Sequence, residues 1–339
     1  MVGRVEAQSG TDRREFLRMA VAAASATAGA TCLVSGGRAA EATGPAIIDC
    51  HQHLWDLDRF RLPWLEEAQP VLRRSYGVED YRAATQGINV RQAVYLEVDV
   101  DASQLDAEAE ALVELSRGQT APTRGVVIGG RPGAEEFAKY IERHRGAPEI
   151  KGVRQVLNGP ATPPGHCTSR QFVDSIRRLA EFDWSFDLCI AASRLDEVIR
   201  LVEQAPDTRF ILDHCGGADP KAWFPDQAPT APSHEVDAWK RSLDALARHD
   251  RVDCKISGVV ASLPEGWGSD RLAPIIDYCL EAFGPDRVVF GSDWPVCLLG
   301  RTYAQWVGLL TEVIGQRPAD EQRRLWHDNA LRVYRLQKV

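Results

Sequence analysis

Two histidines separated by one residue give the strongest chemical signal in the sequence. His51 and His53 end the segment Ile47-Ile48-Asp49-Cys50-His51-Gln52-His53, which begins as an apolar strand. Side chains alternate between the two faces of a strand, so Asp49, His51 and His53 are expected to point the same way. Two imidazoles so placed can bind one metal ion or one anionic substrate. A pair of loop histidines bonded to the backbone is the structural alternative.

Two further polar residues close apolar segments. Asp293 follows the segment 287–292, and a carboxylate there can act as a general base that activates water. His214 follows the segment 208–213 and can ligate a metal, hold a substrate oxygen or donate a proton. An Asx turn or helix cap for Asp293, and a structural role for His214, are the alternatives.

Three charged residues lie within or directly after apolar segments. Arg154, in Lys151-Gly152-Val153-Arg154-Gln155, can grip a carboxylate or polarise an ester carbonyl, and a structural ion pair is equally compatible. Glu97 ends the segment 94–97 and is a candidate metal ligand. Lys255 lies in the apolar segment 252–258 and is expected to be a buried cation, for which a structural ion pair is the better interpretation.

Eight apolar segments alternate with amphipathic helical patterns. This alternation predicts one distorted (β/α)8 TIM barrel with a C-terminal helical extension over residues 318–336. A doubly wound sheet would normally carry a Gly-rich turn after its first strand, where this chain has Cys50-His51-Gln52-His53. The expected strands are 46–50, 92–98, 124–129, 151–156, 185–190, 208–213, 252–256 and 287–290.

A barrel would bring the candidate residues together, because its active site forms at the carboxyl ends of its strands. Two long segments, 54–76 and 215–233, follow strands and are expected to cover that mouth. The residues expected to bind substrate are Arg154, His214, Trp55, Arg61, Trp64 and Tyr76.

The composition suits a large globular enzyme. The chain has 339 residues, of which 44% are hydrophobic and 26% charged, and this excludes intrinsic disorder and a small disulfide-stapled scaffold. Its net charge of −8 and its lack of basic runs argue against binding to nucleic acid or to anionic membranes. The expected partner is a small-molecule substrate, and a homo-oligomer stays open.

The N-terminal residues are typical of an export signal. Arg13-Arg14 precedes an Ala-rich apolar run, and Ala40-Glu41-Ala42 offers a small-residue cleavage site. We therefore expect residues 1–42 to be a twin-arginine signal peptide, residues 43–339 to be the barrel domain, and the protein to be periplasmic or secreted. The apolar run is too short for a stable membrane anchor. Seven cysteines follow Cys32 without a CxxC motif, and we expect them to pack as small apolar residues.

The combined motifs resemble the amidohydrolase superfamily. The segments 151–155, 212–216, 254–258 and 290–295 are similar to those of its amidohydrolase-2 branch, which includes L-fuconolactonase-like and 2-pyrone-4,6-dicarboxylate lactonase-like enzymes. The resemblance runs from Ala46 to Tyr334. It implies a TIM barrel that hydrolyses lactone esters, often those of sugar acids.

The resemblance also bears on the metal. Binuclear relatives supply a lysine from strand four and a histidine from strand five, and this chain has neither at the right place. One divalent ion, zinc, held by His51, His53 and Asp293 with help from Glu97 or His214, is therefore expected. A metal-free reaction is the alternative.

The predicted activity is hydrolysis of a sugar-acid or carboxylated lactone. Asp293 would be the general base, and Arg154 and His214 would stabilise the oxyanion. Two alternatives remain open at this point. One is a decarboxylase of an aromatic or unsaturated acid in the same superfamily, and the other is a non-catalytic periplasmic binding protein for sugar acids.

Overall fold

Eight parallel strands form one sheet in chain order. The computed structural model describes residues 43–118, 120–159 and 161–338, and the expected signal peptide lies outside these residues. Every strand pairs in parallel with the next one along the chain, as the buried Val/Ile-rich segments predict. The strands are β1 (Thr43–Gln52), β2 (Ile88–Leu96), β3 (Thr123–Gly129), β4 (Ile150–Val156), β5 (Ser185–Cys189), β6 (Arg209–Leu212), β7 (Val252–Ile256) and β8 (Val288–Phe290).

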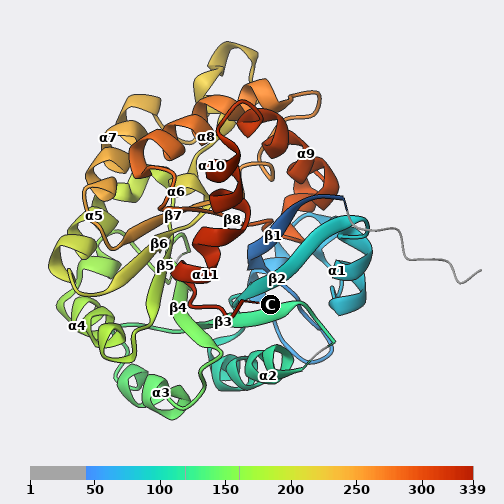
Figure 1. The fold of residues 1–339 in the computed structure, drawn as a ribbon. Coiled ribbons are helices and arrows are strands. Elements are labelled where there is room, and N and C mark those ends of the chain that lie inside the picture. The colour runs from blue at the N-terminus through green and yellow to red at the C-terminus, as the bar shows by residue number, and fades with distance from the viewer. Residues whose placement is uncertain (1–42, 119, 160, 339) are drawn as a thin grey trace, which may run out of the picture. The chain divides into compact units, whose positions relative to one another are not determined.

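Helices surround this sheet on its outer side (Figure 1). The arrangement is the expected (β/α)8 barrel, and each long helix buries one apolar stripe against the strands. The helices are α1 (Val78–Ala84), α2 (Leu105–Arg117), α3 (Phe137–His144), α4 (Arg170–Leu179), α5 (Leu195–Gln204), α6 (His214–Gly217), α7 (Val236–Ala247), α8 (Ser269–Phe283), α9 (Tyr303–Ile314), α10 (Ala319–Arg323) and α11 (Asn329–Val333).

Backbone bonds between β1 and the residues after β8 bring the two ends of the sheet together. The amide of His53 donates to the carbonyl of Trp294 at 2.8 Å, and the amide of Asp293 donates to the carbonyl of His51 at 2.8 Å. The barrel is therefore nearly closed. The same two bonds fix the backbone of three candidate site residues.

Asp49 completes this junction and does not join the histidines. Its carboxylate accepts hydrogen bonds from the amide and hydroxyl of Ser292, at 2.8 and 2.6 Å, and from the hydroxyl of Tyr81 at 2.8 Å. The expectation that Asp49, His51 and His53 share one direction is wrong for Asp49. The pairing of β1 with β2 shifts register between Asp49 and Gln52, so the simple alternation of side chains is interrupted there.

The C-terminal extension covers the amino-terminal ends of the strands. Helices α10 and α11 lie across the centre of the ring in Figure 1, and they are joined by a wider helical turn, Arg324–Asp328, instead of forming one continuous helix. The Arg335 guanidinium donates to the carbonyl of Lys151, near the start of β4. The hydroxyl of Tyr334 donates to Asp187 inside the barrel at 3.1 Å. The opposite, carboxyl-terminal ends of the strands are left to form the site.

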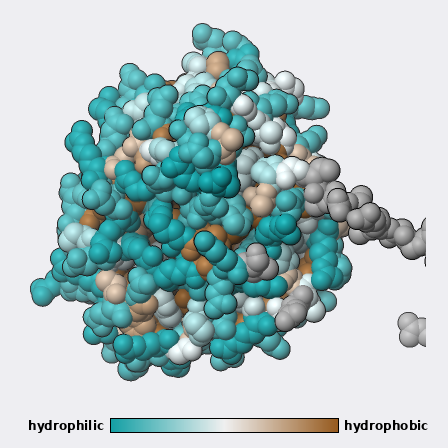
Figure 2. Space-filling model, viewed as in Figure 1, coloured by the Kyte–Doolittle hydropathy of each residue, from teal (hydrophilic) through white to brown (hydrophobic). Residues whose placement is uncertain are grey.

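The cysteines and the surface agree with an ordinary globular barrel. All seven cysteines from Cys50 onward are buried and free, which confirms their expected role in packing. The face drawn in Figure 2 is mostly hydrophilic, with hydrophobic residues only in small separate spots. No helix among the described residues is long and apolar enough to cross a membrane.

Candidate functional site

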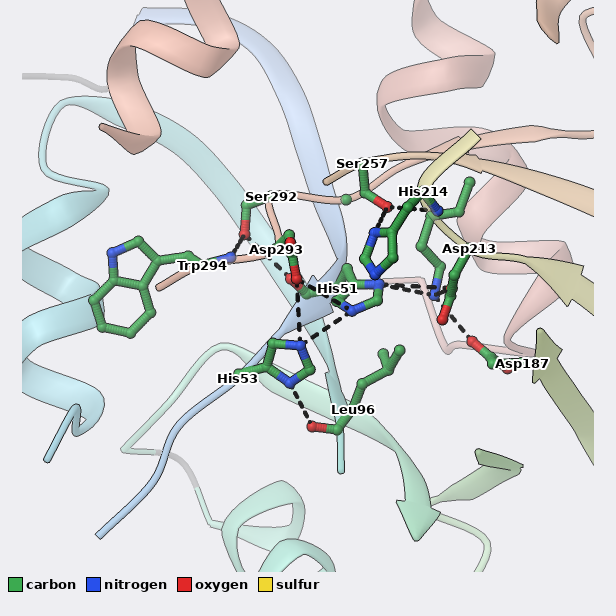
Figure 3. Close-up of polar contacts among 12 residues, drawn as sticks. His51, His53, Leu96, Asp187, Asp213, His214, Ser257, Ser292, Asp293 and Trp294 are labelled. Atoms are coloured by element: carbon green, nitrogen blue, oxygen red, sulfur yellow. Dashed lines mark hydrogen bonds and ion pairs between the residues drawn. The ribbon is translucent and has the colours of Figure 1, made fainter. Parts of the chain in front are cut away.

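His51, His53 and Asp293 meet at the carboxyl-terminal end of the barrel (Figure 3). The Nε2 atoms of the two histidines lie 3.1 Å apart. Oδ1 of Asp293 lies 3.5 Å from Nε2 of His51 and 3.4 Å from Nε2 of His53. All three residues are buried, so two nitrogens and one carboxylate oxygen converge where little water competes.

The neighbouring backbone orients these side chains. Nδ1 of His53 lies 2.9 Å from the carbonyl of Leu96 at the end of β2, which turns Nε2 toward Asp293. Asp293 itself has a φ of +57°, in the left-handed region that side chains other than glycine rarely adopt. The chain turns sharply after β8, and this turn directs the carboxylate back over the end of β1.

His214 lies beside this group, as its place after β6 predicts. Its ring centroid is 4.5 Å from that of His51, and its Nδ1 lies 3.0 Å from the hydroxyl of Ser257. Burial lowers the pKa of His214, so the imidazole is neutral at neutral pH. His214 also has a positive φ, +56°, and packs directly on Gly258.

A buried ion-pair network supports His51 from below. Nζ of Lys255 lies 2.9 Å from Asp187 and 2.7 Å from Asp213, and all three side chains are fully buried. Nδ1 of His51 is 3.3 Å from the same ammonium. Burial and then the Lys255 charge lower the pKa of His51 well below its ordinary value. The expected structural ion pair of Lys255 is confirmed.

Arg154 and Glu97 form a second buried pair. Nε of Arg154 donates to the Glu97 carboxylate at 2.6 Å, and Nη2 donates to the Glu97 carbonyl at 2.6 Å. The other carboxylate oxygen of Glu97 accepts from the amide of Asp99 at 2.7 Å. Both Glu97 oxygens are therefore occupied, and Glu97 belongs to neither donor group of the described residues that could hold a metal. The expectation that Glu97 is a metal ligand is not supported, because it anchors Arg154 instead.

Within the part of the chain that the structure describes, two sets of donors could hold a metal ion. One is His51, His53 and Asp293, as the sequence predicts, and the other is His51, Asp213 and His214. The first set fits a zinc ion, because imidazole nitrogens and a carboxylate oxygen are donors that zinc prefers. In the second set the Asp213 carboxylate already pairs with the ammonium of Lys255 at 2.7 Å, whereas Asp293 of the first set lies against the two histidines, so the second set is less suited to another cation.

A cavity of about 260 Å³ opens above these residues. Trp55 and Trp64 line one part of it, with ring centroids 5.7 Å apart and planes at 87°. The polar side chains that line the cavity are His53, Asp99, Arg154, His214 and Asp293.

Two expected substrate-binding residues do not line this cavity. Arg61 is exposed and pairs with Asp101 and Glu66, at 3.0 and 3.4 Å. The Tyr76 ring is buried against Trp55, and its hydroxyl donates to the carbonyl of Val71 at 2.6 Å. Tyr76 thus packs against Trp55 and does not contact the cavity itself. The segment 54–76 folds so that Arg61 faces solvent.

Three acidic residues of the site were not identified from the sequence. Asp187 and Asp213 belong to the buried network, and Asp99 lines the cavity. Asp187 carried a usable signal, since it is the one charge in the apolar segment 184–190. Asp99 gave no such signal, because an aspartate after a strand is a common turn residue.

Comparison with known proteins identifies related chains. Residues 48–336 match the family described as Amidohydrolase. An L-fucono-1,5-lactonase of Burkholderia multivorans is 30% identical over 299 residues, covering 86% of this chain and 97% of the relative. An L-rhamnono-gamma-lactonase of Scheffersomyces stipitis is 24% identical and covers 86% and 98%. A crystal structure of a Burkholderia multivorans amidohydrolase with bound zinc has a TM-score of 0.74 at 27% identity, covering 86% of this chain and 100% of that chain.

Proposed function

The chain belongs to the amidohydrolase family, and on that premise we propose that it is an enzyme that hydrolyses the ester bond of a lactone. The observation that carries the proposal is the Asp293 carboxylate, held against two histidines at the base of a cavity that Arg154 and His214 also line. The relatives named as sugar-acid lactonases support this reaction class.

In the proposed reaction, water attacks the lactone carbonyl while the Asp293 carboxylate accepts its proton. The negative charge that develops on the carbonyl oxygen is stabilised by Arg154 and by the neutral ring of His214. The ester C–O bond of the ring then breaks, and protonated Asp293 returns the proton to the leaving alkoxide. The product is an open-chain hydroxy acid.

One zinc ion is part of the proposal, with His51, His53 and Asp293 as the residues that would hold it. The hydrogen bond from Nδ1 of His53 to Leu96 leaves the Nε2 atom for such an ion, and only Oδ1 of Asp293 faces the two rings. A zinc ion at these atoms would supply Lewis-acid polarisation of the substrate carbonyl.

Export by the twin-arginine route is also proposed, on the sequence of residues 1–42. The test replaces Arg13 and Arg14 together by lysine and follows the protein in cell fractions. Export predicts that the wild type is found outside the cytoplasm and that the variant is retained inside it.

The function is tested with Asp293→Asn on a panel of sugar and carboxylated lactones, followed with a pH indicator. We expect kcat to fall by about 10²- to 10⁴-fold, the usual contribution of a general base. Asp58→Asn, at an exposed position in the segment after β1, is the matched control and should retain activity. Wild-type-like turnover by Asp293→Asn would remove Asp293 as the base. Release of carbon dioxide, or tight binding without turnover, would overturn the lactonase proposal.

A further inference from the structure

The charged groups that line the cavity are unevenly balanced. Asp99 and Asp293 contribute two carboxylates, and Arg154 is the one guanidinium among the residues that line the cavity. The side chains of Arg154 and Glu97 are 5% and 0% exposed, so their ion pair is shielded from water. A carboxylate on a substrate would have to displace Glu97 from Arg154.

The remaining nitrogen of Arg154 also faces the protein. Its Nη1 lies 3.2 Å from Nε2 of His51 and 3.7 Å from Oδ2 of Asp213. With Nε and Nη2 on Glu97, each nitrogen of the guanidinium has a protein neighbour. Arg154 therefore has no free pair of N–H groups to bind a substrate carboxylate in a bidentate manner. Its positive charge can still polarise a nearby carbonyl.

Unlike Arg154, which is a hydrogen-bond donor bound to other protein groups, Asp99 presents a hydrogen-bond acceptor to the cavity. It follows β2 with a φ of +50°, and its Oδ1 accepts from Arg131 at 2.9 Å. Oδ2 has no hydrogen-bond partner among residues 43–118, 120–159 and 161–338. Arg131 donates its other terminal nitrogen to the carbonyl of Gly130, which holds the pair in place. The left-handed backbone, which aspartate adopts more readily than most residues, and the bond to Arg131 together hold this carboxylate at the cavity.

The two tryptophans add an apolar surface without free donors. The Trp55 indole N–H donates to the carbonyl of Arg74 at 2.6 Å, and the Trp64 indole N–H donates to the carbonyl of Val98 at 2.8 Å. The rings therefore offer only their apolar faces and edges. An acceptor carboxylate beside such rings suits a molecule with hydroxyl donors on one side and C–H groups on the other.

We propose that Asp99 is a specificity-determining residue that accepts hydrogen bonds from ring hydroxyls, so that the enzyme selects uncharged polyhydroxylated lactones over lactones bearing a carboxylate. This inference rests on the proposed lactonase activity and narrows its substrate class. Attraction comes from hydroxyls that donate to Asp99 and from contact with Trp55 and Trp64. Rejection comes from the Asp99 carboxylate, which repels a substrate carboxylate on its side of the cavity, and from Arg154, whose guanidinium is already held by Glu97.

The experiment compares three lactones on the full-length enzyme: a six-carbon aldono-1,5-lactone, the unsubstituted lactone of the same ring size, δ-valerolactone, and 2-pyrone-4,6-dicarboxylate. The wild type is expected to prefer the aldonolactone. Asp99→Asn, which tolerates the left-handed backbone, should lower kcat/KM for the aldonolactone by about 10- to 100-fold, mainly through KM. Its effect on δ-valerolactone should stay below about threefold, since that substrate lacks the hydroxyls.

The matched control is Asp101→Asn, two residues further along, where the carboxylate pairs with Arg61 outside the cavity. It should leave the order of the three substrates unchanged. A wild-type preference for the dicarboxylate, or an equal loss by Asp99→Asn on all three lactones, would overturn the role of Asp99 while leaving the lactonase activity intact. If the wild type opens none of the three lactones, both this inference and the lactonase proposal fail.

Discussion

Nζ of Lys255 lies 2.7 Å from Oδ1 of Asp213 in the fully buried centre of the barrel. Burial raises the pKa of Asp213, but the interactions with Lys255, His51 and His214 together outweigh it, and the pKa falls well below its ordinary value. The ammonium thus stands beside the second donor set, which Asp213 shares with His51 and His214. Two unit charges 4 Å apart repel by about 4 kcal/mol at an effective dielectric constant of ~20.

We therefore expect the protein to bind one zinc ion per chain. Elemental analysis of the zinc-loaded, desalted protein checks the number. The variant His53→Ala should lose this ion, because it removes a donor of the first set and leaves the second set complete. Two equivalents of tightly bound zinc in the wild type would contradict the repulsion from Lys255.

Gly258 should be required for the position of His214. A Cβ atom on Gly258 would lie 2.6 Å from Cγ of His214, far closer than atoms pack. Gly258→Ala is expected to lower lactonase kcat by about 100-fold through displacement of the ring.

Gly266→Ala provides a matched control for this change. Gly266 has a similar φ, +79° against +70°, but its Cβ would meet nothing within 4 Å. Both variants should lose about 1–2 kcal/mol of stability from backbone strain, and only Gly258→Ala should lose activity. Equal activities, measured beside thermal melting, would show that the contact with His214 does not matter.

Glu108 on α2 should make stability depend on pH. Burial, followed by the charge of Glu97, raises the pKa of Glu108 from 4.5 to about 8. Between these values the folded state holds a proton that the unfolded state has lost. The free energy of unfolding should therefore fall with rising pH, by up to about 1.4 kcal/mol per unit, and the decline should end near the folded-state pKa.

Glu108→Gln should remove this part of the slope, because its side chain does not titrate. Urea unfolding at several pH values from about 5 to about 8 measures the slope. Glu110→Gln, at an exposed position on the same helix, should leave it as in the wild type. The same slope in Glu108→Gln and the wild type would show that Glu108 ionises normally.

The barrel and the central residues of the site were predictable from sequence. Short apolar segments with helical patterns between them predict parallel strands, and parallel strands that close on themselves place their carboxyl ends at one mouth. For that reason His51, His53, His214 and Asp293 could be assigned to one site before their distances were known. A buried anionic partner for Lys255 was also expected, although not which residue it would be, since a cation inside an apolar strand must be paired.

The partner of each charged side chain was decided only by the tertiary structure. Glu97 looked like a ligand but binds Arg154, and Asp187 and Asp213 share Lys255 because β5, β6 and β7 are adjacent. Such pairings depend on strand register, and a shift of one residue turns a side chain to the other face.

In the long segment 54–76 after β1, the sequence likewise predicted the role of the segment but not the direction of each side chain. Its Trp and Arg content predicted a substrate-contacting loop, yet Trp55 and Trp64 line the cavity while Arg61 faces solvent. Periodicity and composition determine which elements form, and they therefore determined the barrel and its mouth. The direction of a side chain in an irregular segment depends on contacts with residues distant in sequence, such as the bond from Trp64 to Val98, and only the folded chain supplies these.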